Sequence, residues 1–300
     1  MPRIALVTAR VARGTDHDMP ALLQAFSVAG AHAEEADWDD PAVDWSRYDA
    51  ALLRSPWDYV DRHAEFMVWA ERTAGLTRLL NPLHVLRWNI DKHYLADLAA
   101  AGVATVPSRF IEPAEDADAA LSAFLAEHPA STEFVIKPAI GAGSRDARRH
   151  GRDQLDAMRE HLHQLLAVGR SALLQPYLAR VDLAGETALI YLDGEFNHAI
   201  RKGPLLRPGA AATRELYASE DIAPRTAEPD ELALAARAVA SIPVEASLCY
   251  ARVDLIRDDA GAPCLLELEL VEPSLFFAHA TGSASRLAAA VLQHTPRSAL

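Results

Sequence analysis

Four charged residues near the C-terminus are spaced so that a β-hairpin would gather them on one face. Arg252 and Asp254 are two positions apart, and so are Glu267 and Glu269. Residues two apart in a strand point to the same side of a sheet. The segment 258–261 between them, Asp-Asp-Ala-Gly, has the composition of a turn. If the two strands pair, three carboxylates and one guanidinium lie together.

Such a cluster favours a bound cation. Carboxylates with apolar neighbours repel one another and lose hydration unless a cation joins them. Oxygen ligands without histidine or cysteine favour Mg²⁺, which commonly bridges protein carboxylates and nucleotide phosphates. The hairpin therefore predicts a magnesium site that handles phosphates. The alternative is a polar outer face on an amphipathic hairpin, which the same alternation would produce.

A second candidate site lies in the middle of the chain. The apolar run 133–138 reads as a buried strand that carries Lys137 near its end, and a buried ammonium needs an anionic partner. Gly141, Gly143 and Ser144 follow directly. Glycines let backbone amides approach and wrap phosphate oxygens, so this segment is a candidate phosphate loop.

A further lysine, Lys92, falls in the first turn of a helix expected over residues 89–101. A lysine there opposes the helix dipole, so an anionic partner is favoured. The alternative is a lysine exposed to water.

The N-terminal part must position the remaining candidates. Its pattern predicts a β-α-β beginning with a small parallel sheet, in which Asp18 caps the first helix. Ligands of such sheets bind beyond the carboxyl ends of the strands, where Arg54 and Asp58 occur. Arg54 is a candidate for gripping a carboxylate; alternatively it pairs with Asp58. The expected strands cover residues 3–9, 31–38 and 50–54.

Bulk composition narrows the possible functions. A chain of 300 residues with a formal charge of −13 suits a multi-lobed enzyme and disfavours nonspecific binding to nucleic acid or anionic membranes. We expect a cytoplasmic protein, because neither a secretory signal nor a membrane span is evident. Cys249 and Cys264 fall in expected strands and read as buried, reduced thiols.

These segments together resemble the ATP-grasp superfamily of carboxylate–amine ligases. The resemblance rests on the Asp-Lys pair at 91–92, on Lys137 followed by proline and the glycine loop, and on the hairpin. Asp254 and Glu267 keep the thirteen-residue separation of D-alanine–D-alanine ligases, while Glu269 replaces the usual Asn. The resemblance implies an ATP-grasp fold, α/β and α+β, with a Rossmann-like N-terminal α/β domain at 1–88, a central subdomain with the phosphate lid at 89–172 and a C-terminal subdomain at 173–300.

The resemblance also implies roles for individual residues toward ATP and Mg²⁺, with two ions expected. Lys92, Lys137 and the lid residues Gly141, Gly143 and Ser144 would contact phosphates. Either Asp182 or Glu186 would bind ribose. The remaining implied contacts are the adenine hinge at Gln175, Tyr177 and Leu178, the catalytic cations Lys202 and Arg252, and the metal ligands Asp254, Glu267 and Glu269.

Three motifs resemble one branch of the superfamily, which includes O-ureido-D-serine cyclo-ligase: RSPWDY at 54–59, RWNIDK at 87–92 and LVEPS at 270–274. That branch implies activation of a carboxylate as an acyl phosphate, internal attack by a nitrogen, and ring closure to D-cycloserine with loss of CO₂ and NH₃. The alternative is an intermolecular ligase that joins an amino acid to an amine or a second amino acid. The partner would be a small molecule, and relatives also allow a homodimer. The expected substrate contacts are Arg54, Asp58, Arg214, Glu272 and Ser274.

Overall fold

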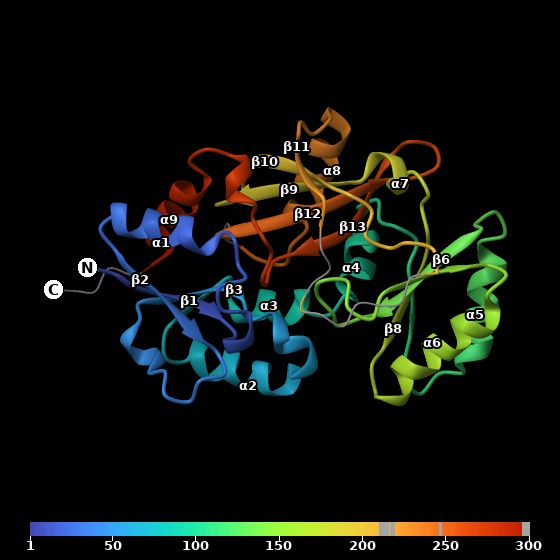
Figure 1. The fold of residues 1–300 in the computed structure, drawn as a ribbon, viewed down its shortest axis with the longest axis horizontal. Helices are drawn as coiled ribbons and strands as arrows, with labels where there is room; N and C mark the ends of the chain where they lie inside the picture. Colours follow the sequence, from blue (N-terminus) through green and yellow to red (C-terminus); the bar gives the residue numbers. More distant parts are fainter. Residues whose placement is uncertain (210–215, 217–219, 246–247, 296–300) are drawn as a thin grey trace.

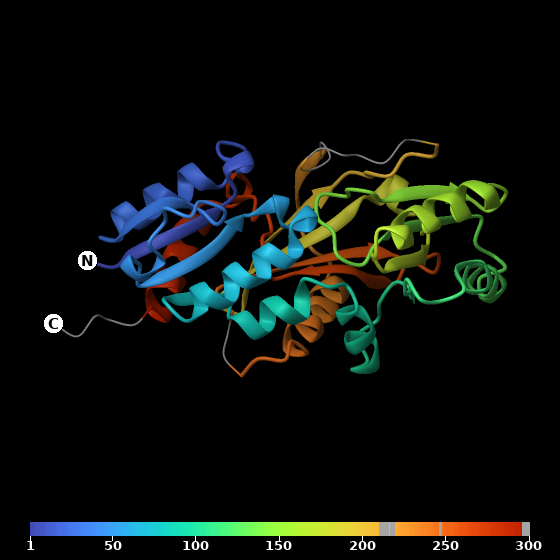
Figure 2. The ribbon, with the colours of Figure 1, turned by 90° about the horizontal axis from the view of Figure 1, so that it is seen from below.

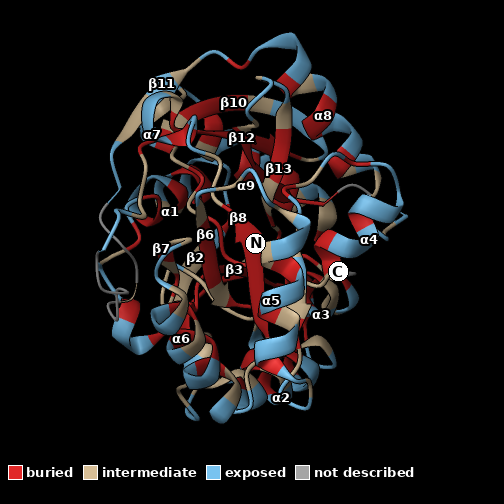
Figure 3. Ribbon diagram, turned by 90° about the vertical axis from the view of Figure 1, so that its right-hand side faces the viewer, coloured by how far each residue is buried: buried red, intermediate tan, exposed pale blue. Residues whose placement is uncertain are grey.

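The chain builds three β-sheets that meet around a common centre (Figure 1). The computed structural model describes all residues except 210–215, 217–219, 246–247 and 296–300. Strands of all three sheets are largely buried, while the outer faces of the surrounding helices are exposed (Figure 3). No helix in the part of the chain that the structure describes combines the length and apolar character needed to cross a membrane.

The N-terminal sheet has the order β2-β1-β3-β4, and its paired strands are parallel, as predicted. Helix α1 packs on one face together with α9, which returns from the C-terminal end of the chain (Figure 1). Helices α2 and α3 contribute to an aromatic core on the other face. The elements are β1 (Arg3–Thr8), α1 (Met19–Val28), β2 (His32–Asp37), β3 (Ala50–Ser55), α2 (His63–Ala74), β4 (Arg78–Leu80), α3 (Leu83–Asn89) and α9 (Ser283–His294).

The central sheet has the order β5-β8-β6-β7 and is antiparallel. Helices α5 and α6 bury their apolar faces against it. The expected division at residue 172 falls at the start of β8, which pairs with β6 and so stays with this sheet. The elements are β5 (Arg109–Ile111), α5 (Ala117–Glu127), β6 (Glu133–Pro138), β7 (Arg148–Gly151), α6 (Leu155–Ala167) and β8 (Ala172–Pro176).

The C-terminal sheet is antiparallel in the order β11-β10-β9-β12-β13. Helices α4 and α8 pack against one face of this sheet (Figure 2). Polar side chains of its strands, such as Lys202, Arg252 and Glu267, line the central cavity. The elements are α4 (Tyr94–Ala100), α7 (Val181–Ala184), β9 (Glu186–Leu192), β10 (Glu195–Lys202), β11 (Ile222–Arg225), α8 (Pro229–Ala240), β12 (Tyr250–Arg257) and β13 (Pro263–Glu269).

Two local predictions were wrong. The helix expected over residues 89–101 is broken: α3 ends at Asn89 and α4 begins at Tyr94. Between them the backbone N–H of Lys92 donates to the carbonyl of Ala139 at 3.0 Å, a bond to the central sheet that replaces the helical one. Asp18 does not cap α1 with its side chain, because its carboxylate accepts N–H groups of a distant loop.

Candidate active site

A cavity of about 900 Å³ lies where the three sheets meet. Its volume is within the roughly 300–1,000 Å³ typical of small-molecule sites. Each sheet contributes to its wall, as Trp57, Lys137 and Glu267 illustrate. The residues predicted from the sequence that line it are Lys92, Lys137, Gly141, Gly143, Ser144, Gln175, Tyr177, Leu178, Glu186, Lys202, Arg252, Glu267, Glu269, Glu272 and Ser274.

The lysines of this chain have an unusual distribution. Lys92, Lys137 and Lys202 are the three lysines in the sequence, and all of them line the cavity. Lys92 and Lys202 are only 6% and 5% exposed. The positive charge outside the cavity therefore comes from arginine, and lysine occurs only at the cavity. The low number of lysines in the sequence could have pointed to all three as site residues, but reasoning from single motifs did not use it.

The predicted C-terminal hairpin forms and gathers its charged residues on one face. Arg252 lies opposite Glu269, and Asp254 lies opposite Glu267. Arg252 donates from Nε to Asp254 Oδ1 at 2.9 Å and from Nη2 to Asp254 Oδ2 at 3.0 Å, and it also donates to Glu269. Lys202 Nζ donates to Asp254 at 2.9 Å and lies 3.2 Å from Glu186. Asp254 itself is 1% exposed and sits behind the cavity wall.

The charge states of these carboxylates differ. Burial alone would raise the pKa of Asp254, but Arg252 and Lys202 outweigh it and lower that pKa to about 2. Burial is likewise outweighed at Glu267, where Lys92 and Lys137 lower the pKa below its usual value. At Glu269 burial prevails over Arg252 and raises the pKa to about 8. An added cation is therefore needed to keep all three groups ionised at neutral pH.

The donor set of the hairpin fits Mg²⁺. Asp254, Glu267 and Glu269 offer only carboxylate oxygens, the ligand type that this ion prefers. Within the described ranges, no group of three or more acidic, histidine or cysteine side chains forms a ready-made metal cage. Mg²⁺ usually takes one or two protein carboxylates and completes its shell with substrate phosphates and water.

The predicted phosphate loop joins β6 to β7 and closes over the cavity. Its backbone turns sharply, with positive φ angles of 60° at Gly143 and 58° at Ser144. Lys92 Nζ donates to the carbonyl of Gly141 at 2.7 Å. Arg145 pairs at 2.5 Å with Asp61 of the N-terminal sheet region. The loop is therefore fastened to two other parts of the molecule.

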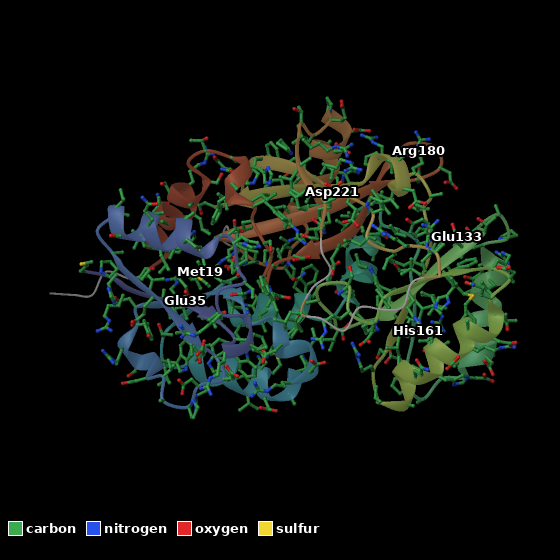
Figure 4. The ribbon with its side chains drawn as sticks, in the orientation of Figure 1. Met19, Glu35, Glu133, His161, Arg180 and Asp221 are labelled. Carbon is green, nitrogen blue, oxygen red and sulfur yellow. The ribbon has the colours of Figure 1, made fainter. Side chains whose placement is uncertain are left out.

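At the end of the cavity near β8, Arg149 organises the wall. Its guanidinium lies 3.6 Å from the ring centroid of Tyr177 and donates to Asp182 at 3.0 Å. Its Nε donates at 2.8 Å to Glu133, which Figure 4 labels on β6. Asp182 lines a smaller hollow of about 270 Å³ instead of the central cavity. Of the two acids expected at ribose, Glu186 is the one that lines the central cavity.

The opposite end of the cavity is acidic and aromatic. The hydroxyl of Tyr59 donates to the carboxylate of Glu272, and Trp57 Nε1 donates to the backbone carbonyl of Glu272 at 3.1 Å. Arg252 Nη1 donates to the carbonyl of Ser274 at 3.1 Å. Asp16 also lines this end and leaves its buried Oδ2 without a hydrogen bond.

Sequence reasoning did not identify Asp16, Trp57 or Tyr59 as site residues. Asp16 follows β1 just as Trp57 and Tyr59 follow β3, and the rule that ligands bind beyond carboxyl strand ends covers both loops. If every side chain in the loops after β1 and β3 had been considered under that rule, Asp16, Trp57 and Tyr59 would have been candidates.

Two expected substrate contacts, Arg54 and Asp58, do not line the cavity, and a third lies outside the described residues. Arg54 is fully buried and lies 3.6 Å from Asp16 and 3.7 Å from Asp18, behind the wall. The alternative pairing of Arg54 with Asp58 was wrong, since Asp58 accepts from Trp38 Nε1 at 2.8 Å and from Arg62 at 3.2 Å. Arg214 lies outside the described residues.

Both cysteines are free and buried, as predicted.

Comparison with known proteins gives consistent matches. A family model described as the N-terminal domain of D-cycloserine synthetase DcsG matches residues 4–81. Cycloserine biosynthesis protein DcsG of Streptomyces lavendulae is 42% identical over 294 residues, which cover 97% of this chain and 98% of that protein.

Solved structures agree. The crystal structure of D-cycloserine synthetase DcsG has a TM-score of 0.94 at 41% identity, covering 98% of this chain and 100% of that one. A D-alanine–D-alanine ligase from Bacillus anthracis has a TM-score of 0.67 at 16% identity, covering 98% and 97% of the two chains, a likeness of fold alone. The mixed α/β architecture is thus the predicted ATP-grasp fold.

Proposed function

The chain belongs to the DcsG family of ATP-grasp ligases, and on that basis we propose that it converts O-ureido-D-serine to D-cycloserine by ATP-driven ring closure. As a member of the family it is an ATP-dependent ligase that forms C–N bonds. The proposed products beside the ring are ADP, phosphate, CO₂ and NH₃. The substrate, its D configuration and these products are the parts of the proposal that need an experiment.

One observation carries the proposal. The same cavity contains the three lysines, the hairpin carboxylates Glu267 and Glu269 and, at the opposite end from β8, the acidic pocket around Glu272. A carboxylate does not react with a nitrogen nucleophile unless its oxygen becomes a good leaving group, and phosphorylation achieves this. Cations for a phosphoryl group and acceptors for an amine are therefore needed side by side, as they occur here.

At the nucleotide end, Lys92 and Lys137 would bind the phosphates beneath the backbone of Gly141, Gly143 and Ser144, and Lys202 would reach the terminal phosphate. The β8 segment around Gln175, Tyr177 and Leu178 would hold adenine, with Glu186 or Asp182 on ribose. Hydrogen bonds between charged groups are stronger than those between neutral groups, which suits a site that must hold the polyanionic phosphates of ATP.

Asp254, Glu267 and Glu269 would hold the metal, and two Mg²⁺ ions are proposed. When bound, Mg²⁺ neutralises charge on the phosphates of ATP. Arg252 belongs to the hairpin and donates both to Asp254 and to the carbonyl of Ser274. Its guanidinium would stabilise negative charge between the γ-phosphate and the substrate carboxylate. Glu272 and Ser274 would accept hydrogen bonds from nitrogen atoms of the substrate.

The test is ADP formation from Mg-ATP with O-ureido-D-serine, followed by mass analysis of the product. The L isomer and reactions without an amino acid are the controls. ADP with a D-cycloserine mass supports the proposal. ADP that requires a separate amine acceptor would indicate the intermolecular ligase instead, and no ADP with either isomer would exclude this substrate.

A further inference from the structure

Glu272 is held at both of its ends by the N-terminal part of the chain. Its carboxylate accepts a hydrogen bond from the hydroxyl of Tyr59, and its backbone carbonyl accepts one from Trp57 Nε1 at 3.1 Å. Tyr59 and Glu272 are 3% and 9% exposed, and both line the cavity. This carboxylate is therefore aimed at the substrate end of the site and fixed in place before a ligand arrives.

The surroundings of Glu272 suit proton transfer. Burial raises its pKa to about 7, and the Tyr59 hydrogen bond and Lys92 offset only part of that rise. Glu267 and Arg252 also act on it, from β13 and β12. A carboxyl group that titrates near neutral pH can take up a proton in one step and release it in the next, which is the property of an efficient general base.

The proposed reaction requires such a base. A nitrogen that attacks the acyl carbon still carries a proton that must leave. Lys92 and Lys202 are paired with carboxylates and cannot accept it as ammonium groups, and Lys137 is assigned to the phosphates. Asp16 is already committed to the buried guanidinium of Arg54 at 3.6 Å. The hairpin carboxylates are paired with Arg252 and the lysines. The remaining candidate for the base is Glu272, two residues before Ser274, whose carbonyl accepts a hydrogen bond from Arg252.

We propose that Glu272 is the base that removes the proton from the attacking nitrogen, and that Tyr59 positions it. This inference rests on the proposed function. In the step, the nitrogen lone pair forms the C–N bond and the acyl C–O bond to phosphate breaks. Phosphate departs with that electron pair, and the N–H proton passes to a carboxylate oxygen of Glu272. Ring closure itself requires no other reactant; one water is consumed afterwards, when the carbamoyl group leaves the ring nitrogen as CO₂ and NH₃.

The first test separates phosphorylation from ring closure. With Glu272→Gln, rapid-quench experiments at saturating Mg-ATP and O-ureido-D-serine should still show a burst of ADP, because acyl phosphate formation needs no base at the nitrogen. Ring formation should fall by about 100-fold or more, the usual contribution of general base catalysis. Product formation within twofold of the wild type would overturn the proposal, and so would loss of the ADP burst, which would make Glu272 a binding residue.

The second test uses the positioning residue and does not depend on the first variant folding. Tyr59→Phe removes a hydrogen bond that lowers the pKa of Glu272, so the acidic limb of kcat/KM against pH should move to higher pH. Tyr48→Phe is the matched control, since Tyr48 donates to Glu34 at 2.9 Å outside the cavity, and its profile should equal that of the wild type. An unmoved limb in Tyr59→Phe would overturn the role of Tyr59. A wild-type enzyme without ADP formation would instead refute the proposed function.

Discussion

The ammonium of Lys92 lies 2.9 Å from the carboxylate of Glu267, so a residue expected to bind phosphate and one expected to bind metal neutralise each other. The same holds for Lys202 and Asp254 at 2.9 Å. Under the proposed assignment, binding of Mg-ATP would exchange each of these pairs for two new ones, lysine with phosphate and carboxylate with metal. Until then, the two ion pairs partly neutralise the site.

Glu267→Gln should abolish turnover while leaving the fold intact. The amide lacks the charge that a metal requires and leaves Lys92 without its counter-charge, so we expect ADP formation to fall by at least about 100-fold at every Mg²⁺ concentration. Steady-state assays over a Mg²⁺ titration and a thermal melt measure the two effects. Glu71→Gln, which breaks only an exposed pair with Arg87, is the control. A near-normal rate in Glu267→Gln would remove the metal assignment.

Lys137→Ala should weaken ATP binding strongly. A charge-assisted hydrogen bond contributes about 1.5–3 kcal/mol, which corresponds to roughly a 10- to 100-fold rise in Kd. Calorimetry with Mg-ATP in the absence of amino acid isolates binding from catalysis. Lys137→Met keeps the aliphatic length and should show the same loss if charge is the cause. An unchanged Kd in both variants would mean that the phosphates lie elsewhere.

Asp18→Ala should destabilise the protein although Asp18 lies outside the hairpin. Its carboxylate accepts the backbone N–H groups of Leu275, Phe276 and Phe277 at 2.6, 3.0 and 2.8 Å. Removing it leaves three donors unsatisfied, and we expect a loss of about 3–5 kcal/mol in the free energy of unfolding. Chemical denaturation measures this.

Asp44→Ala is the matched control for that loss. It removes two exposed hydrogen bonds, from the N–H and the hydroxyl of Ser46, and should cost about 1 kcal/mol. Equal losses in the two variants would show that the bonds from Asp18 to the loop contribute little.

A histidine pair behind the phosphate loop predicts acid sensitivity. His150 Nε2 and His161 Nδ1 are 3.1 Å apart, and His161 Nε2 lies 3.1 Å from the carbonyl of Asp146; Figure 4 labels His161 on α6. Burial, reinforced by Arg148, lowers both pKa values from 6.5 to about 4. The unfolded chain therefore binds more protons between these values, and the stabilisation present above pH 6.5 is lost as the pH falls toward 4.

The measurement is thermal or denaturant unfolding between pH 4 and pH 7. Each histidine should contribute less than about 1.4 kcal/mol per pH unit, because partial solvent screening reduces the full linkage value. His161→Gln should flatten the pH dependence relative to the wild type, while His32→Gln, an exposed histidine, should leave it unchanged. A slope unaffected by His161→Gln would contradict the prediction.

The features predictable from the sequence were those set by local spacing. Alternation and a short turn predict that the charged residues of the hairpin share one face, and the structure confirms this. The register was not predictable, because a β-bulge between Asp254 and Leu255 sets Asp254 opposite Glu267. Burial and partners across the chain were not predictable. The carboxylate of Asp18 contacts a loop more than 250 positions away, and Arg54 disappears behind Asp16 and Asp18 because three segments enclose it. Tyr59 and Glu272 meet only because the N-terminal sheet packs against the end of the hairpin.

The confinement of lysine to the cavity has a practical consequence. A reagent that acylates primary amines finds its targets in this chain at Lys92, Lys137, Lys202 and the N-terminal amine. Protection of the three side chains by a bound nucleotide can therefore be read peptide by peptide in a mass spectrum, without an activity assay. Apart from the N-terminal amine, every primary amine that such a reagent could modify in this protein lines the cavity.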